Sequence, residues 1–344
     1  MPGASALNAR AFICGCSGPV LTRDEIRFLE DAAPWGLILF ARNVEDPDQI
    51  RALIAEFRAA VGWEAPVLID QEGGRVQRLC PPRWRAYPPA AHFGVLHAID
   101  ERAAEEAARL NARLIGRDLA LLGITVDCLP VLDLRLPETH AVIGERAYHS
   151  DPRRVAALGR ATCEGLRAAG VVPVVKHIPG HGRATADSHL ELPEVTADAR
   201  TLRREDFEPF RRLADMPVAM TAHIVYKAFD PQRPATLSAA IIGEVIRGEI
   251  GFEGLLMSDD LSMGALTGSV RARADALFKA GCDMALHCNG RLDEMAAVAE
   301  AAPPLAGQRA RRAAAALAFV GEAAPIDEDA TWERLCGLLA AQGS

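Results

Sequence analysis

Ionisable side chains recur directly after short apolar runs in this 344-residue chain. Carboxylates and imidazoles can serve as nucleophiles and as general acids or bases, and together they also suit zinc. Any one of them could be a strand-end residue satisfied by a neighbouring loop, but so many at the ends of successive runs favour one shared site. The candidates are Asp70-Gln71-Glu72, Asp127 with Asp133 after it, Lys176-His177, His223, Ser258-Asp259-Asp260 and His287.

The loop after Lys176-His177 holds a second candidate, the pair formed by Asp187 and His189. A carboxylate at this spacing can accept a hydrogen bond from one imidazole nitrogen, which fixes the tautomer and raises the basicity of the other nitrogen. Taken alone, the pattern is more typical of an Asx or Ser turn with a solvent-facing histidine. Prolines and glycines within 176–183 disfavour a helix, so His177 and His181 do not form a helical metal-binding pair.

Eight short apolar segments must position these residues, and they alternate with segments whose apolar residues recur at helical spacing. Strands that alternate with helices indicate a parallel sheet, and continuous apolar strands indicate burial on both faces. We therefore predict an α/β fold, a single-domain (β/α)₈ TIM-type barrel over residues 1–344 with a helical tail from about 300 to 344; a doubly wound open sheet is the alternative. The expected strands are 11–14, 36–40, 67–69, 124–127, 172–175, 218–221, 254–257 and 284–287, and the clearest helices are 46–61, 101–122, 152–169, 239–249 and 270–280.

The composition describes a globular protein without a feature that favours nucleic acid or an anionic membrane surface. Half of the residues are hydrophobic, 24% are charged, and the formal net charge is −8. The 8 cysteines lie mostly in apolar or helical segments and show no zinc-ribbon spacing, so we expect buried free thiols rather than disulfides. We see neither an export signal nor an apolar run long enough for a membrane span, and we expect a cytoplasmic location.

Three segments carry a resemblance to a known family. Residues 69–78 (IDQEGGRVQR), residues 176–182 (KHIPGHG) with Asp187-Ser188-His189, and residues 258–263 (SDDLSM) resemble the motifs of glycoside hydrolase family 3, and within it the bacterial β-N-acetylhexosaminidases of peptidoglycan recycling. The resemblance runs in order from about residue 11 to about residue 290. Two positions depart from the pattern: Ala147 stands where Ser is common, and Arg183 replaces an acidic residue, which bears on the loop's local contacts.

The resemblance implies a retaining exo-β-N-acetylglucosaminidase that acts on cytosolic muropeptides (N-acetylglucosaminyl-1,6-anhydro-N-acetylmuramic acid, with or without peptide) through a covalent glycosyl-enzyme. It implies Asp259 as nucleophile, in preference to its neighbour Asp260, and His189 as acid/base with Asp187 as its partner. The residues that it assigns to binding the terminal sugar are Asp70, Arg78, Arg146, Lys176 and His177. Regular alternation along a strand allows only one of Asp259 and Asp260 to point into a barrel mouth.

Several alternatives remain open at this point. Without the resemblance, Arg146 and Lys176 could equally be members of structural ion pairs. A metal-dependent hydrolase on the same barrel could use His177, His181, His189, His223 and Asp259. A family 3 enzyme of other specificity, a phosphorylase, and a non-catalytic sugar-binding barrel are further possibilities. We expect no cofactor, no resident metal, no nucleic-acid or membrane partner, and a monomer.

Overall fold

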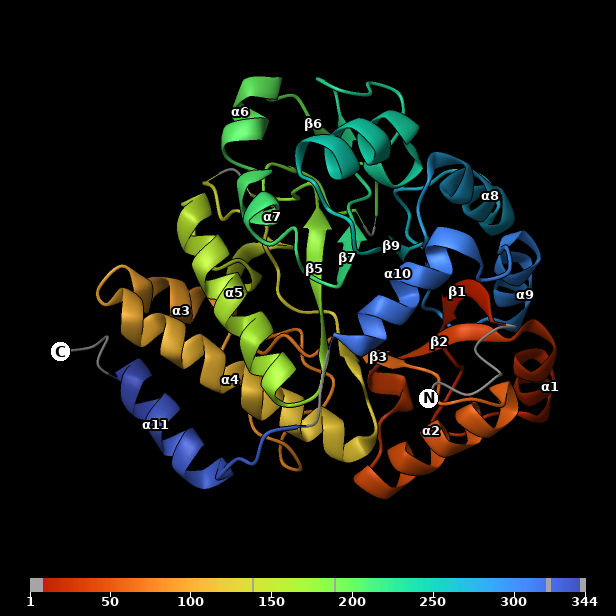
Figure 1. Ribbon diagram of the computed structural model, residues 1–344, viewed down its shortest axis with the longest axis horizontal. Coiled ribbons are helices and arrows are strands. Elements are labelled where there is room, and N and C mark those ends of the chain that lie inside the picture. Colours follow the sequence, from red (N-terminus) through yellow and green to blue (C-terminus); the bar gives the residue numbers. More distant parts are fainter. Residues whose placement is uncertain (1–8, 138, 189, 320–322, 341–344) are drawn as a thin grey trace.

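The computed structural model describes residues 9–137, 139–188, 190–319 and 323–340 as a closed barrel of eight parallel strands surrounded by helices (Figure 1). Around the barrel the strands follow the order β1, β2, β3, β4, β5, β7, β9, β10, and β10 pairs with β1 to close it. The predicted (β/α)₈ barrel is therefore confirmed, and the alternative of a doubly wound open sheet is wrong. The strands are β1 (Arg10–Cys14), β2 (Pro34–Leu39), β3 (Val67–Ile69), β4 (Val126–Asp127), β5 (Val172–Ile178), β7 (Val218–Thr221), β9 (Leu255–Asp260) and β10 (Met284–His287).

Helices connect most of the strands, and their ends follow from local capping. Thr22 and Glu25 form a capping box at the start of α1, and Asp46 caps α2 ahead of Pro47. Gly62 and Gly123 end α2 and α4 in the left-handed region, which glycine adopts without strain. The helices are α1 (Arg23–Ala32), α2 (Pro47–Val61), α3 (Ala90–His97), α4 (Glu101–Leu122), α5 (Pro152–Ala168), α6 (Ala199–Arg204), α7 (Glu208–Arg212), α8 (Val270–Ala280), α9 (Leu292–Ala301), α10 (Gly307–Ala318) and α11 (Glu328–Ala340), with a π-helix over Ile241–Glu249.

Two strands run further than the apolar pattern predicts. β5 continues to Ile178 and β9 continues to Asp260, so the polar residues expected after these strands form their last positions. The pairing of β5 with β7 and that of β10 with β9 both shift register near these ends. Such irregularities interrupt the alternation of side chains, and they therefore change which side chains face the barrel mouth.

The C-terminal segment is helical, as expected, but its two helices have different places. Ala313 and Ala316 of α10 are buried in the same apolar cluster as the side chains that fill the barrel interior. The backbone of Pro303 and Leu305, just ahead of α10, bonds the chain at the start of β1, so α10 covers the N-terminal end of the barrel (Figure 1). By contrast, α11 packs on the outside against α4.

The cysteines agree with the sequence-based expectation. All 8 are free thiols, and only Cys80 and Cys336 are exposed. Within the described ranges, no helix combines the length and the apolar character that crossing a membrane would require.

Candidate active site

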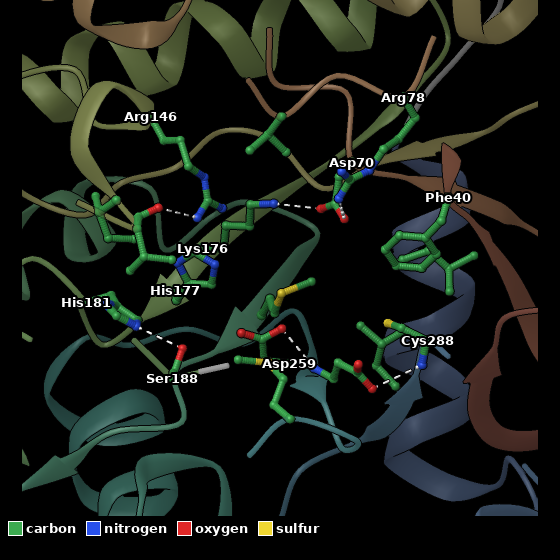
Figure 2. A pocket seen from close by; sticks show the side chains of 18 of the residues that line it. Phe40, Asp70, Arg78, Arg146, Lys176, His177, His181, Ser188, Asp259 and Cys288 are labelled. Atoms are coloured by element: carbon green, nitrogen blue, oxygen red, sulfur yellow. Dashed lines mark hydrogen bonds and ion pairs between the residues drawn. The ribbon is translucent and has the colours of Figure 1, made fainter. Parts of the chain in front are cut away.

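A cavity of about 340 Å³ opens at the carboxyl ends of the barrel strands, the end where TIM barrels place their active sites (Figure 2). Its volume lies at the small end of the range for ligand pockets, about 300–1,000 Å³. Ile38, Met220 and Leu286 contribute apolar lining from β2, β7 and β10. Most of the remaining lining is polar, and it comes from the chain at the ends of β3, β5 and β9 and from the loop after β4.

The polar lining on the β3–β5 side is a network of ion pairs. Lys176 Nζ lies 2.8 Å from Asp70 Oδ1 and 2.7 Å from Glu72 Oε1. Arg146 donates to both oxygens of Glu72, Nε to Oε2 and Nη2 to Oε1, each at 2.8 Å. Arg78 Nη2 lies 3.3 Å from Asp70 Oδ2. The network joins residues that lie far apart in the sequence, and Figure 2 shows Lys176 pointing toward Asp70 across the top of the cavity.

Charge compensation keeps this network ionised although it is buried. Burial alone would raise the pKa of Asp70, but Lys176 and Arg78 outweigh it, and the pKa lies well below its ordinary value. Arg146 and Lys176 likewise overcome burial at Glu72 and lower its pKa to about 2. Burial opposes the charge of Lys176 as well, but Asp70 and Glu72 hold its pKa above the ordinary value. Fixed charges that are already paired need little reorganisation when a polar ligand binds.

A second buried carboxylate, Asp133, orients His177. Asp133 Oδ2 lies 2.6 Å from Nδ1 of His177, and Oδ1 accepts the backbone N–H groups of His177 and His181. An ionised carboxylate can only accept, so Nδ1 of His177 carries the proton and Nε2 is left toward the cavity. Burial opposes the ionised form of Asp133, but His177 and His181 lower its pKa to about 2.

Asp259 lies on the opposite side of the cavity from the ion-pair network (Figure 2). Its Oδ1 accepts the backbone N–H of Asp260 at 2.8 Å. Burial would raise its pKa, but the imidazoles of His223 and His177 and this hydrogen bond outweigh burial, so the pKa is lowered and the carboxylate is ionised at neutral pH. Asp259 is therefore an anionic side chain facing the cavity from a barrel strand.

Asp260 also lines the cavity, which corrects the expectation that only one of the two neighbours points into the mouth. The register shift at the end of β9 is the physical reason, because it breaks the alternation. The Asp260 carboxylate is occupied by its own surroundings: it accepts the backbone N–H of Ser262, the Ser262 hydroxyl and the backbone N–H of Cys288. Asp260 thus ties the end of β9 to the end of β10.

His223 is fully buried beneath this segment and has both ring nitrogens engaged. Nε2 donates to the Asp260 carbonyl at 3.0 Å, and Nδ1 lies 2.8 Å from the Thr236 hydroxyl. Burial lowers its pKa, which favours the neutral ring. His223 is therefore a support for the backbone next to Asp259 rather than an available ligand. In the described part of the chain no three His, Cys, Asp or Glu side chains lie close enough together to hold a metal ion.

The loop after β5 is anchored immediately before His189. The Ser188 hydroxyl lies 3.3 Å from Nε2 of His181, and the Ser188 carbonyl accepts the backbone N–H of Ala265. Burial lowers the pKa of His181 to about 4, so this ring is neutral near pH 7. His189 itself lies outside the described residues.

Comparison with known proteins identifies the family. Residues 21–315 match the model of the glycosyl hydrolase family 3 N-terminal domain. The chain belongs to glycosyl hydrolase family 3. It is 43% identical over 282 residues to a β-hexosaminidase of Alkalilimnicola ehrlichii, covering 80% of this chain and 79% of that protein. It is 41% identical over 303 residues to a β-hexosaminidase of Pseudomonas aeruginosa, covering 86% and 88%.

A solved structure extends the family match to the whole barrel. NagZ of Neisseria gonorrhoeae in complex with N-trifluoroacetyl-D-glucosamine is 33% identical, with a TM-score of 0.83 over 98% of this chain and 97% of that one. The enzyme class predicted from the sequence motifs, a family 3 glycoside hydrolase of the β-hexosaminidase type, is confirmed.

For this family 3 enzyme, the structure brings six of the predicted site residues to one cavity: Asp70, Arg78, Arg146, Lys176, His177 and Asp259. Arg146 and Lys176 are members of ion pairs and also line the cavity. Membership of an ion pair therefore does not exclude a role for either residue in binding a ligand. Asp187 belongs to the described loop but is not part of the lining.

Sequence reasoning missed the importance of Glu72 and Asp133. Both are buried behind the lining, and each holds side chains that form it. The signal available was that Glu72 lies two residues after Asp70 in a polar strand-end motif, and that Asp133 follows the Asp127 strand. For neither residue does the sequence indicate which side chain it contacts.

Proposed function

We propose that this chain is a retaining exo-β-N-acetylglucosaminidase that releases terminal N-acetylglucosamine from muropeptides during peptidoglycan recycling. The observation that carries the proposal is the two-sided cavity, with the ionised Asp259 on one side and the paired charges around Lys176 on the other. The β-hexosaminidase names of the relatives and the glucosamine derivative bound to the NagZ neighbour support the same sugar. On this proposal the enzyme works as a monomer in the cytoplasm on N-acetylglucosaminyl-1,6-anhydro-N-acetylmuramic acid, with or without its peptide.

The ion-pair network would hold the terminal sugar. Asp70 offers acceptor oxygens to hydroxyl groups, while Arg78, Arg146 and Lys176 offer donors, and His177 presents its Nε2. Because Asp70, Glu72 and Asp133 fix these donors in place, their orientation is set before the sugar arrives. The small cavity admits one sugar ring at its base, which suits cleavage from a chain end.

Asp259 would act as the nucleophile. As the glycosidic bond breaks, positive charge develops at C1, and the carboxylate stabilises it before an oxygen of Asp259 bonds to C1. His189, with Asp187 as its partner, would donate a proton to the leaving oxygen. In the second step His189 would take a proton from water, water would attack C1, and Asp259 would leave, so the β configuration is retained.

A panel of chromogenic glycosides tests the sugar, and the natural disaccharide tests the aglycone. We expect the β-N-acetylglucosaminide to be hydrolysed faster than the β-glucoside and the β-xyloside. The disaccharide N-acetylglucosaminyl-1,6-anhydro-N-acetylmuramic acid should yield free N-acetylglucosamine with β configuration in the first product seen by NMR. Faster cleavage of the β-glucoside, or an α-configured first product, contradicts the proposal.

A further inference from the structure

We propose that Arg75, at the rim of the cavity, binds a carboxylate carried by the leaving group of the substrate. The inference rests on the proposed function and assigns a residue to the part of the substrate beyond the scissile bond. It also specifies a preference between the two forms of the proposed substrate: the peptide-free disaccharide, whose lactyl carboxylate is free, is preferred over the form whose lactyl group is joined to a peptide through an amide bond.

The charges around the cavity set Arg75 apart from the other cationic side chains that line it. Lys176 and Arg146 contact Glu72, and Lys176 and Arg78 contact Asp70, so all three are compensated by carboxylates. In the described part of the chain, the guanidinium of Arg75 contacts only backbone carbonyls. The carboxylate of Glu145 accepts the backbone N–H of Arg75 rather than its guanidinium. Arg75 therefore brings a positive charge that no carboxylate of the described residues pairs.

Those carbonyl contacts also hold the Arg75 guanidinium in place. Its Nη2 donates to Ala141 and Val142 and lies 3.5 Å from the Ile143 carbonyl. Val142 and Ile143 themselves line the cavity, so the guanidinium is fixed at the cavity wall. Nε and Nη1 have no partner among the described residues, and they remain available to an anion. An arginine that is already immobilised loses less conformational freedom on binding, and each of its free N–H groups can donate a charge-assisted hydrogen bond to a carboxylate oxygen.

The position of Arg75 fits the leaving group rather than the terminal sugar. Arg75 is exposed although it lines the cavity, whereas Lys176 and His177 on the same wall are buried. A substrate whose terminal ring occupies the buried end must pass its next unit across the exposed rim. The rim charge is thus placed for the second sugar, where it adds selectivity without entering the ion-pair network.

Two measurements test the inference together. The first compares kcat/KM of the unmodified enzyme for the N-acetylglucosaminyl-anhydromuramic acid disaccharide with that for the same disaccharide whose lactyl carboxylate is converted to the neutral methyl amide. We expect the acid to be preferred about fivefold at low salt, the upper end for a partly exposed ion pair, and the preference to shrink at high salt. Equal kcat/KM values for acid and amide overturn the inference.

The second measurement repeats this comparison with Arg75→Gln, Arg75→Lys and the control Arg135→Gln. Arg135 is an exposed arginine of the connection after β4, which also holds residues 141–143, and it does not line the cavity, so its variant removes one positive charge elsewhere. The acid-to-amide ratio should fall toward one in Arg75→Gln, remain raised in Arg75→Lys, and match the unmodified enzyme in Arg135→Gln. An equal loss on both substrates in Arg75→Gln, with the ratio preserved, would show that Arg75 only supports the 141–143 loop.

These outcomes separate the two proposals. If the enzyme hydrolyses chromogenic N-acetylglucosaminide but neither disaccharide, the muropeptide proposal fails and the inference fails with it. If it hydrolyses both disaccharides equally well, only the role of Arg75 is overturned. If circular dichroism shows that Arg75→Gln is unfolded, the inference is still tested by comparing the acid and the amide with the unmodified enzyme at low and high salt.

Discussion

Replacement of Glu72 by Gln should destabilise the fold by about 3 kcal/mol at pH 7. The carboxylate is buried and bonded to Arg146 and Lys176, and in the folded protein these charges lower its pKa from the ordinary 4.5 to about 2. At about 1.4 kcal/mol for each pKa unit, that depression corresponds to about 3 kcal/mol. A separate estimate agrees, since removal of one partner from a buried ion pair typically costs about 3 to 5 kcal/mol.

The pH dependence gives the prediction a second, independent signature. A carboxylate whose folded pKa is depressed stabilises the protein above its unfolded pKa of 4.5, and this stabilisation is lost as the pH falls through about 2. The difference between the two proteins should therefore be full at pH 7 and smaller by about 1 kcal/mol at pH 3.5.

Urea unfolding followed by circular dichroism at both pH values measures this difference. Glu164→Gln is the matched control, because Glu164 forms an exposed ion pair with Arg109, and its loss should cost less than about 1 kcal/mol. A loss below about 1 kcal/mol for Glu72→Gln at pH 7, or a loss that does not shrink at pH 3.5, would refute the charge argument.

Four further expectations concern the reaction. Asp259→Asn should reduce kcat by at least about a thousandfold while leaving affinity for N-acetylglucosamine largely intact, as titration calorimetry can check; a residual rate above one per cent argues against a nucleophile. His189→Ala should impair cleavage of the natural disaccharide about a hundredfold, but activated aryl glycosides much less, because good leaving groups need little protonation. Asp187→Ala should act in the same direction, and equal losses on both substrate types would contradict the acid role. Prolonged dialysis against a chelator should leave the rate unchanged; a loss restored by added zinc would favour the metal-dependent alternative.

The sequence was sufficient for the barrel because its apolar runs are both continuous and regularly spaced. Each barrel strand begins within two residues of its predicted start, and α4 has the same bounds as the helix predicted at 101–122. The C-terminal limits of β5 and β9 were less predictable. Lys176, His177, Asp259 and Asp260 are polar, and apolar patterning gives no reason to include them in a strand.

The site was predictable as a set of positions, but not as a set of contacts. Glu72 and Arg146 are separated by 74 residues, and Asp70 and Lys176 by 106, so only closure of the barrel brings these partners together. Local spacing carries no information about such pairs, and Glu72 could not be distinguished from an ordinary loop carboxylate. The finding that both Asp259 and Asp260 line the cavity was unpredictable for a similar reason. It depends on a register shift between β9 and β10, and the sequence of β9 alone does not reveal how it pairs with its neighbour.

The position of α10 over the N-terminal end of the barrel has a consequence for the order in which products would be released. Ala313 and Ala316 pack into the barrel interior at the N-terminal end, whereas the cavity opens at the carboxyl ends of the strands, so on the proposed function both products would leave at the carboxyl end. On the proposed function, a sugar at the buried end of the cavity could leave only after the rest of the substrate had departed, so release would be sequential, with the terminal sugar last. Because the proposed disaccharide carries one terminal sugar, each encounter would end after a single cleavage and the release of both products. Free N-acetylglucosamine that returned to the buried end would compete directly with the next substrate.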